Sequence, residues 1–220
     1  MSYLLRVVLP DRPGMLGAVA TALGEAGADI VSLDVVERGP DGAVDDLLVQ
    51  LPPGRMADSL ITAACSVPGV QVESLRPYLG ADDLHRDLEL VDEIAAAPRH
   101  ALRLLVDHAP GVFRAGWAVL VDAGGVRGHS VGAPELDDVP LTWLPLTGPR
   151  RVGSSEDWVP ARWRDLGTEL AACPVGDPGT AVLIGRPGGP RFRDSEVVRL
   201  AHLAGIAATV VAGSGSTAPA

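Results

Sequence analysis

The stretch Leu4–Leu23, LLRVVLPDRPGMLGAVATAL, most constrains what this chain can fold into. In its first part the apolar residues Leu5, Val7 and Leu9 occupy alternate positions, a pattern typical of a half-buried strand. From Leu16 onward, apolar residues recur at helical spacing. The sequence therefore predicts a strand, a tight turn and a helix in immediate succession.

The turn of this unit, 11–16, carries chemistry as well as geometry. Pro13 has a φ preset for a first helical turn, where its missing N–H costs nothing. Gly14 has no Cβ, so a ligand or a second chain can approach the backbone, and Gly27 is placed to end the helix. Backbone N–H groups and the positive end of a helix dipole lie beside the Asp11 carboxylate. This combination suits the carboxylate and the ammonium group of an amino acid.

Further elements follow the helix in a recognisable order. Asp29-Ile30-Val31 opens a second strand, and G-P-D-G at 39–42 predicts a hairpin. Apolar residues at 56, 60, 63 and 67, beginning with Met56, form one stripe of a second helix. Pro68-Gly69 then turns the chain into a last strand, Val70–Arg76.

The D-R-P-G-M-L turn and the elements after it resemble the ACT domain, a small ligand-binding module that regulates amino-acid metabolism. The resemblance covers Met1 to about Tyr78. It implies an α+β fold, a ferredoxin-like βαββαβ sandwich in which two helices cover one face of the sheet. It also implies a homodimer, because ACT ligand sites are commonly built between two copies.

By the same resemblance, the ligand lies where the turn of one unit meets the second strand of a neighbouring unit. The ligand-binding residues implied are Asp11, Arg12, Pro13, Gly14, Met15, Leu16, Asp29, Ile30 and Val31. Asp11 or Asp29 would receive the ligand ammonium, and N–H groups near Gly14 its carboxylate. The alternative is that Asp11 only caps the helix and Asp29 only starts a strand.

The second half of the chain reads as helices around paired strands. Its first helix spans 84–97 with Leu88 on the apolar stripe, and its last helix spans Ser195–Val211 and carries apolar residues that include Val198, Leu200 and Ile206. Pro98 interrupts the first helix, and a second begins there. The strands expected between them are 116–122, 126–131, 141–146, 166–174 and 180–185.

This order resembles a GAF domain, a sensory relative of PAS domains. The most specific part is A-V-L-I-G at 181–185, followed by Arg191-Phe192, D-S-E at 194–196 and an apolar final helix. The resemblance implies an antiparallel sheet with flanking helices and leaves the ligand of this half open. The predicted organisation is an ACT domain at 1–79, a GAF-like domain at 84–212 and a disordered tail at 213–220.

One motif favours a different function. G-H-S-V-G at 128–132 matches G-x-S-x-G, the nucleophile elbow of serine hydrolases, with Ser130 as nucleophile. That elbow requires a helix directly after the serine, but Pro134 and Pro140 follow. The motif therefore supports only a minor alternative, a serine esterase.

Composition limits the partners and the chemistry. The net charge is −10, and all 18 basic residues are arginine. This argues against nucleic acid as a partner and excludes lysine-based catalysis. Cys65 and Cys173 are far apart and are expected to pack as small apolar side chains. No spacing typical of metal ligands occurs, and no cofactor is implied. With no signal peptide and no apolar run of membrane length, we expect a cytoplasmic protein that does not contact membranes.

The sequence thus predicts a non-catalytic, allosteric ligand sensor. A small amino acid binds at the ACT interface of a homodimer, and the first helix of the second half couples binding to the GAF-like domain. A stand-alone regulatory subunit that docks on an amino-acid biosynthetic enzyme is the alternative in a different class. Neither the amino acid nor the downstream target follows from the residues.

Overall fold

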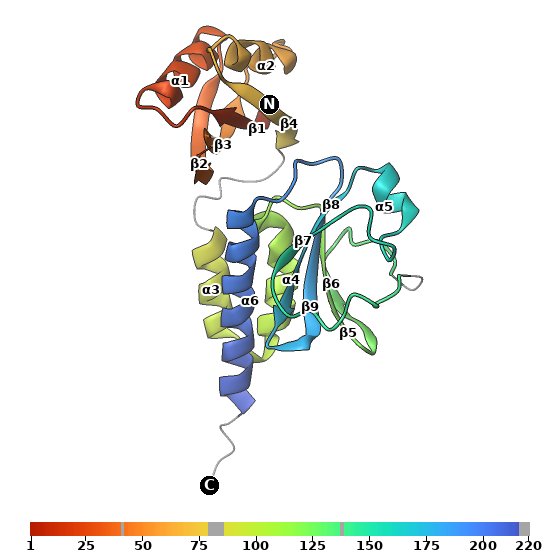
Figure 1. Cartoon of the computed structure of the whole chain (residues 1–220). Helices are drawn as coiled ribbons and strands as arrows, with labels where there is room; N and C mark the ends of the chain where they lie inside the picture. Colours follow the sequence, from red (N-terminus) through yellow and green to blue (C-terminus); the bar gives the residue numbers. More distant parts are fainter. Residues whose placement is uncertain (41, 79–85, 137–138, 216–220) are drawn as a thin grey trace. The chain divides into compact units, whose positions relative to one another are not determined.

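The computed structural model describes residues 1–40, 42–78, 86–136 and 139–215. The chain divides into two compact units, Met1–Leu84 and His85–Ala220 (Figure 1). The predicted hairpin residue Asp41 and the start of the helix expected at 84–97 lie outside the described residues. Each unit has its own sheet and its own hydrophobic core.

The first unit has the predicted βαββαβ order. Its elements are β1 (Ser2–Leu9), α1 (Met15–Glu25), β2 (Asp29–Gly39), β3 (Gly42–Gln50), α2 (Asp58–Cys65) and β4 (Gln71–Tyr78). The strands form one antiparallel sheet in the order β2-β3-β1-β4. This is the ferredoxin-like arrangement expected from the sequence.

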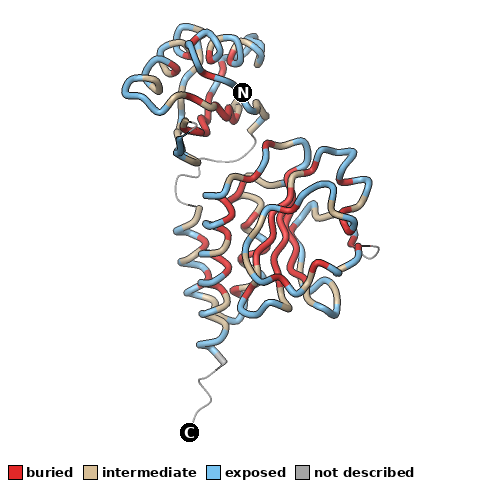
Figure 2. The backbone as a smooth tube through the Cα atoms, in the orientation of Figure 1, coloured by how far each residue is buried: buried red, intermediate tan, exposed pale blue. Residues whose placement is uncertain are grey.

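One face of this sheet packs against α1 and α2. Leu5 and Leu47 from the strands, Val19 from α1 and Leu60 from α2 are completely buried in the shared core. Figure 2 shows these buried segments in red, with the outer sides of the helices exposed. The stripe predicted for the second helix was wrong at Met56, which is 70% exposed and precedes α2.

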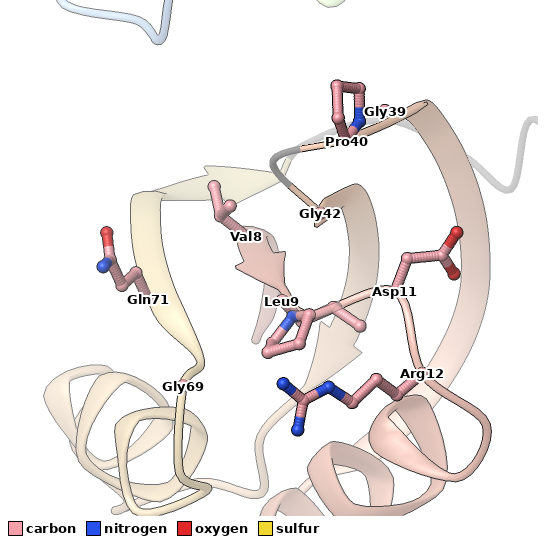
Figure 3. Close-up of a pocket in the computed structure, with 10 residues that line it drawn as sticks. Val8, Leu9, Asp11, Arg12, Gly39, Pro40, Gly42, Gly69 and Gln71 are labelled. Atoms are coloured by element: carbon pink, nitrogen blue, oxygen red, sulfur yellow. The ribbon is translucent and has the colours of Figure 1, made fainter.

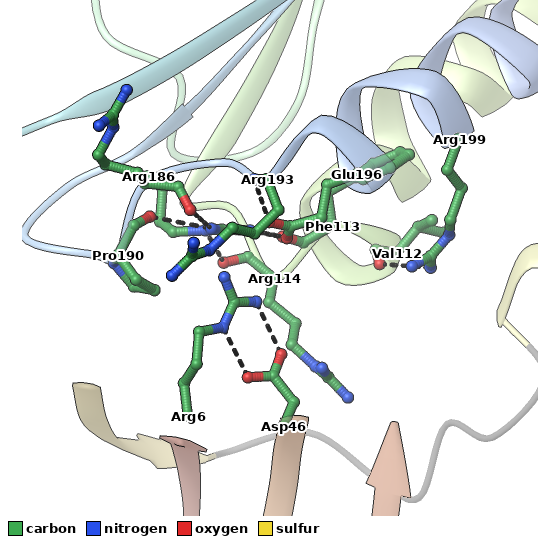
Figure 4. Close-up of polar contacts among 11 residues, drawn as sticks. Arg6, Asp46, Val112, Phe113, Arg114, Arg186, Pro190, Arg193, Glu196 and Arg199 are labelled. Atoms are coloured by element: carbon green, nitrogen blue, oxygen red, sulfur yellow. Dashed lines mark hydrogen bonds and ion pairs between the residues drawn. The ribbon is translucent and has the colours of Figure 1, made fainter. Parts of the chain in front are cut away.

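Both faces of β1 carry buried side chains. Arg6, between two core residues, is on the opposite face from α1 and α2. Its Nε donates to Oδ1 of Asp46 over 2.7 Å, and its Nη2 donates to Oδ2 over 2.8 Å (Figure 4). The expected half-buried strand thus has a paired charge on its second face.

The second unit is a five-stranded antiparallel sheet in the order β6-β5-β9-β8-β7. Its strands are β5 (Trp117–Asp122), β6 (Gly125–His129), β7 (Arg150–Val152), β8 (Glu169–Val175) and β9 (Asp177–Arg186). Its helices are α3 (Arg86–Ala96), η1 (Pro98–His100), α4 (Ala101–Val112), α5 (Ala161–Asp165) and α6 (Asp194–Gly215). This antiparallel sheet with flanking helices confirms the predicted GAF/PAS-like fold class.

Three helices, α3, α4 and α6, form the core on one face of this sheet. Ile94, Leu105 and Leu200 are completely buried there. The prediction that Leu88 lies on the buried stripe of α3 was wrong, because Leu88 is 68% exposed. Its neighbour Leu90 is completely buried instead.

The long segment between β6 and β8 is only partly regular. The strand expected at 141–146 does not form. Pro145 cannot donate to a strand ladder, and the N–H of Leu146 instead donates to the carbonyl of Pro178 over 2.7 Å. The short β7 and α5 are the regular elements within this segment.

The last helix, α6, extends past the predicted end at Val211. Residues 213–215, predicted to belong to a disordered tail, are helical, and 216–220 lie outside the described residues. Residues 194–214 are long enough to cross a membrane, and an 18-residue window within them has a mean hydropathy of 1.5. Leu203, Ala204 and Ala207 of this helix lie in the core of the second unit, as in the core helix of a globular fold.

Candidate functional site

A pocket of about 600 Å³ lies at the end of the first sheet where β1 runs into α1 (Figure 3). Three connections meet there: the β1–α1 turn, the β2–β3 hairpin and the α2–β4 turn. The lining residues are Val8, Leu9, Pro10, Asp11, Arg12, Gly39, Pro40, Gly42, Gly69 and Gln71. The predicted turn therefore contributes Asp11 and Arg12 to a pocket.

The turn closes by short backbone hydrogen bonds. The N–H of Arg12 donates to Pro10 over 2.8 Å, and the N–H of Met15 donates to Arg12 over 3.2 Å. The helix starts at Met15, so the prediction that Pro13 lies in its first turn was wrong. Gly14 lies between Pro13 and the first helical residue Met15 and has a φ of +88°, a left-handed conformation that favours glycine.

The start of α1 is open. A Cβ placed on Gly14 would meet no atom within 4 Å, so a ligand can reach the backbone here. Among the described residues, no side chain caps this helix. The structure therefore does not support the alternative in which Asp11 only caps the helix. Asp11 is exposed, and Figure 3 shows its carboxylate and the Arg12 guanidinium pointing apart from one turn.

The second part of the predicted site lies at the other end of the sheet. Asp29 is opposite Gln50, which is opposite Ser2 at the start of β1. The β1–α1 turn, in contrast, follows Leu9 at the other end of β1, which is 8 residues long. At about 3.3 Å per residue, more than about 20 Å separate the two ends. Within one copy the structure does not bring Asp29, Ile30 and Val31 to the turn, so they can contribute only from a second copy.

Asp45 is a residue that the sequence reasoning missed. The structure shows Asp45 only 3% exposed, on the opposite strand face from Asp46. Burial raises the pKa of Asp45; Arg38 opposes the rise, and Asp46 and Asp11 add to it. An aspartate in register with the apolar core positions of β3 was the available signal.

The four tryptophans of the second unit pack in two pairs. Trp143 and Trp158 stack with ring centroids 5.0 Å apart, and Trp117 and Trp163 are also 5.0 Å apart. All four are buried in one apolar cluster on the sheet face away from the helices of its main core. Trp158 and Trp163 therefore pack the irregular segment into this cluster.

Ser130 has the environment of a structural serine. It is 2% exposed, and its Oγ accepts a hydrogen bond from the N–H of Ala118 over 2.8 Å. A turn at Val131-Gly132 follows it, where a nucleophile elbow has a helix. This geometry argues against Ser130 as an exposed nucleophile.

Other reactive groups are dispersed. Within the described ranges, no group of three or more His, Cys, Asp or Glu residues is arranged to hold a metal ion. Cys173 is buried, which raises the pKa of its thiol to about 11. Cys65 is exposed, so its expected role as a packed apolar side chain was wrong.

The family model of the ACT domain matches residues 3–51. This segment contains β1, the turn, α1, β2 and β3, and so both Asp11 and Asp45. The predicted ACT resemblance is confirmed over these residues. A comparison with curated proteins finds no match.

Several solved structures are similar to parts of the chain at low identity. A formyltetrahydrofolate deformylase from Pseudomonas putida KT2440 is 13% identical with a TM-score of 0.30, over 45% of this chain and 38% of that chain. The GAF domain of a protein described as a sensor histidine kinase from Pseudomonas syringae pv. tomato is 14% identical with a TM-score of 0.39, over 59% and 87%. The regulatory subunit of aspartate kinase from Thermus flavus is 11% identical with a TM-score of 0.30, over 92% of both chains. The chain thus spans little more than a third of the deformylase.

Proposed function

We propose that this chain is a cytoplasmic, non-catalytic regulatory protein whose first unit binds a small amino acid at the β1–α1 turn. The observation that carries the proposal is the exposed Asp11 carboxylate next to the uncapped start of α1. The match of the ACT family model to residues 3–51 supports the same site. The pocket of about 600 Å³ is large enough for a small zwitterion.

The two charges of the ligand would meet different groups. Its ammonium group would pair with the Asp11 carboxylate, and its carboxylate would accept hydrogen bonds from backbone N–H groups at the start of α1. Two copies would complete the site, with Asp29 of a second copy near the turn of the first. A two-fold dimer would then have two equal sites.

The response to the ligand would be a change in the arrangement of the two copies. A ligand that contacts both copies stabilises the arrangement in which both contacts form. The helix α3, which follows the first unit in the chain, would carry this change to the second unit. Couplings of this kind are typically about 1–3 kcal/mol.

A thermal-shift screen of the twenty amino acids on the full chain tests this function. A ligand at 100 times its dissociation constant stabilises the folded state by about 2.7 kcal/mol. Asp11→Ala removes a charge-assisted hydrogen bond worth about 1.5–3 kcal/mol and should weaken binding at least about tenfold. Asp58→Ala, which removes an exposed aspartate at the start of the other helix, is the matched control and should leave binding unchanged. A flat screen of the wild type would contradict amino-acid binding.

A further inference from the structure

A second pocket, of about 670 Å³, lies entirely within the second unit. Its walls come from the end of α3, from η1 and from the last turns of α6, and η1 is in contact with α6. The volume is within the range of small-ligand sites, about 300–1,000 Å³. We call this cavity the α3–η1 pocket; it shares no residue with the pocket at the β1–α1 turn.

The lining of the α3–η1 pocket has an apolar part and a cationic part. Ala96, Pro98 and Val210 belong to the apolar part, and Arg99 and His100 of η1 form the cationic part. None of the described lining residues is acidic. A molecule in this pocket would therefore meet hydrocarbon on one side and cationic or N–H donor groups on the other.

Arg99 and His100 have no counter-charge of their own. Across the part of the chain that the structure describes, neither side chain makes a hydrogen bond or an ion pair, and both are exposed. Other arginines of the same unit are paired with a carboxylate, as Arg127 is with Asp122 and Arg150 with Glu156. The chain has 28 acidic residues against 18 arginines, so an unpaired cationic cluster beside an apolar wall is a specific feature of this pocket.

The helix ends give Arg99 an alternative role. Both α3 and α6 end beside the pocket, and a cation near the C-terminal end of a helix stabilises that helix. This role requires no ligand. It predicts that removing the charge lowers the stability of the unliganded chain and leaves ligand affinity unchanged, so binding measurements separate the two roles.

We propose that the α3–η1 pocket binds a small aliphatic monocarboxylate, with its carboxylate at Arg99 and His100 and its hydrocarbon chain against Val210 and the neighbouring apolar residues. A guanidinium presents two parallel N–H donors that match the two oxygens of a carboxylate, and an imidazole adds a further N–H donor. No lining carboxylate is present to pair with an ammonium group, so the pocket favours acids without an amino group. This site is additional to the proposed amino-acid site and assigns a ligand class to the second unit.

Calorimetric titration of the full chain with sodium hexanoate tests the proposal. Hexanamide, which has the same hydrocarbon chain without the charge, should bind more weakly, and butanoate should bind up to about fourfold more weakly for each methylene that it lacks. The substitution Arg99→Gln should weaken hexanoate binding about fivefold, as expected for a charge pair that water can reach. Arg164→Gln is the matched control, because Arg164 is an exposed arginine at the end of α5 and does not line the pocket.

The outcomes separate this site from the proposed function. Saturable hexanoate binding that is weakened in Arg99→Gln and unchanged in Arg164→Gln supports the carboxylate site. Equal hexanoate affinity of the wild type and Arg99→Gln overturns it, and a lower stability of unliganded Arg99→Gln would then assign Arg99 to the helix ends. Absence of hexanoate binding, or equal binding of hexanamide, also overturns it. Asp11→Ala should keep the full hexanoate response, so failure of the amino-acid site leaves this result unchanged, and the reverse also holds.

Discussion

Arg186 at the end of β9 donates a 2.7 Å hydrogen bond from its Nη2 to Oε1 of Glu196 in α6, and both side chains are buried (Figure 4). The same guanidinium also donates to the carbonyls of Phe113 and Pro190, over 2.6 Å and 3.0 Å. One cation therefore joins the end of α4, the strand β9 and the start of α6. The helix dipole at the start of α6 further favours the carboxylate of Glu196.

Removing one member of this pair should be costly. Glu196→Ala leaves the buried Arg186 without its counter-charge, and breaking a buried pair in this way destabilises by about 3–5 kcal/mol. Asp87→Ala breaks the pair of Asp87 with Arg199, whose side chains are 37% and 44% exposed, and should cost less than about 1 kcal/mol. Urea unfolding followed by circular dichroism measures both variants. If both variants lost the same free energy of unfolding, the buried pair would contribute no more to stability than the exposed pair, which would contradict the prediction.

Acid should weaken the irregular segment of the second unit through Glu156. The pKa of Glu156 is lowered from 4.5 to about 2, mainly by two hydrogen bonds from Arg150. Burial acts in the opposite direction, and hydrogen bonds from Trp158 and the N–H of Gly153 lower the pKa further. Because the folded-state pKa is depressed, the stabilisation is complete above the unfolded value. It is lost as the pH falls through about 4.5 toward about 2.

The variant Glu156→Gln tests this pH dependence. Its stability should fall less steeply than that of the wild type between about pH 5 and pH 2, while at neutral pH it should be less stable. Unfolding midpoints in urea across this range measure the difference. Glu89→Gln, at an exposed position of α3, should follow the wild-type curve. Parallel curves for wild type and Glu156→Gln would refute the assignment.

The separation of Asp11 and Asp29 within one copy predicts complementation between two variants. Asp11→Ala and Asp29→Ala should each bind the ligand weakly. When the two are mixed and allowed to exchange subunits, a mixed dimer has one site with both aspartates intact. Calorimetry should then detect restored binding with a stoichiometry of at most about half a site per chain. Full binding by Asp29→Ala alone would remove this residue from the site.

The substitution Ser130→Ala should lower the stability of the fold and leave the rate of ester hydrolysis unchanged. The N–H of Ala118 would lose its acceptor in a buried position, at a cost of about 1–3 kcal/mol. Chromogenic ester hydrolysis should be equally low in the wild type and in the variant. Wild-type hydrolysis that disappears in Ser130→Ala would establish the esterase alternative.

The fold was predictable where local signals agree. The alternation in β1, the turn chemistry and the helical stripe of α1 all lie within one short stretch, and the structure has each of them. Gly39 and Gly42 are paired across the hairpin that their positions predicted. The inward face of α3 was harder to predict, because this helix carries apolar residues on two sides and packing decides between them.

The candidate site was predictable only in its local half. The turn appears in the sequence as one continuous motif, and Asp11 follows from it. Asp45 is far from the turn in the chain and reaches the same side of the sheet through strand pairing. The only signal for Asp45 in the sequence is that this charged residue alternates with the apolar residues of β3 that face the core. The first residues of the predicted second strand, Asp29-Ile30-Val31, lie at the far end of the sheet because of the antiparallel register of β2 and β3, which no local pattern specifies.

The adjacent aspartates of β3 have a consequence for how the chain reaches its native pairing. If β3 slipped by one residue relative to β1, every side chain of β3 would change faces. Asp46 would then enter the hydrophobic interior, and in one of the two possible slips Asp45 would lie across from Arg6. That misaligned sheet would again have one aspartate in the core and one beside the arginine. The two neighbouring acids therefore cannot by themselves specify the alignment of β3, which has to come from the packing of its apolar residues and from the hairpin that joins it to β2.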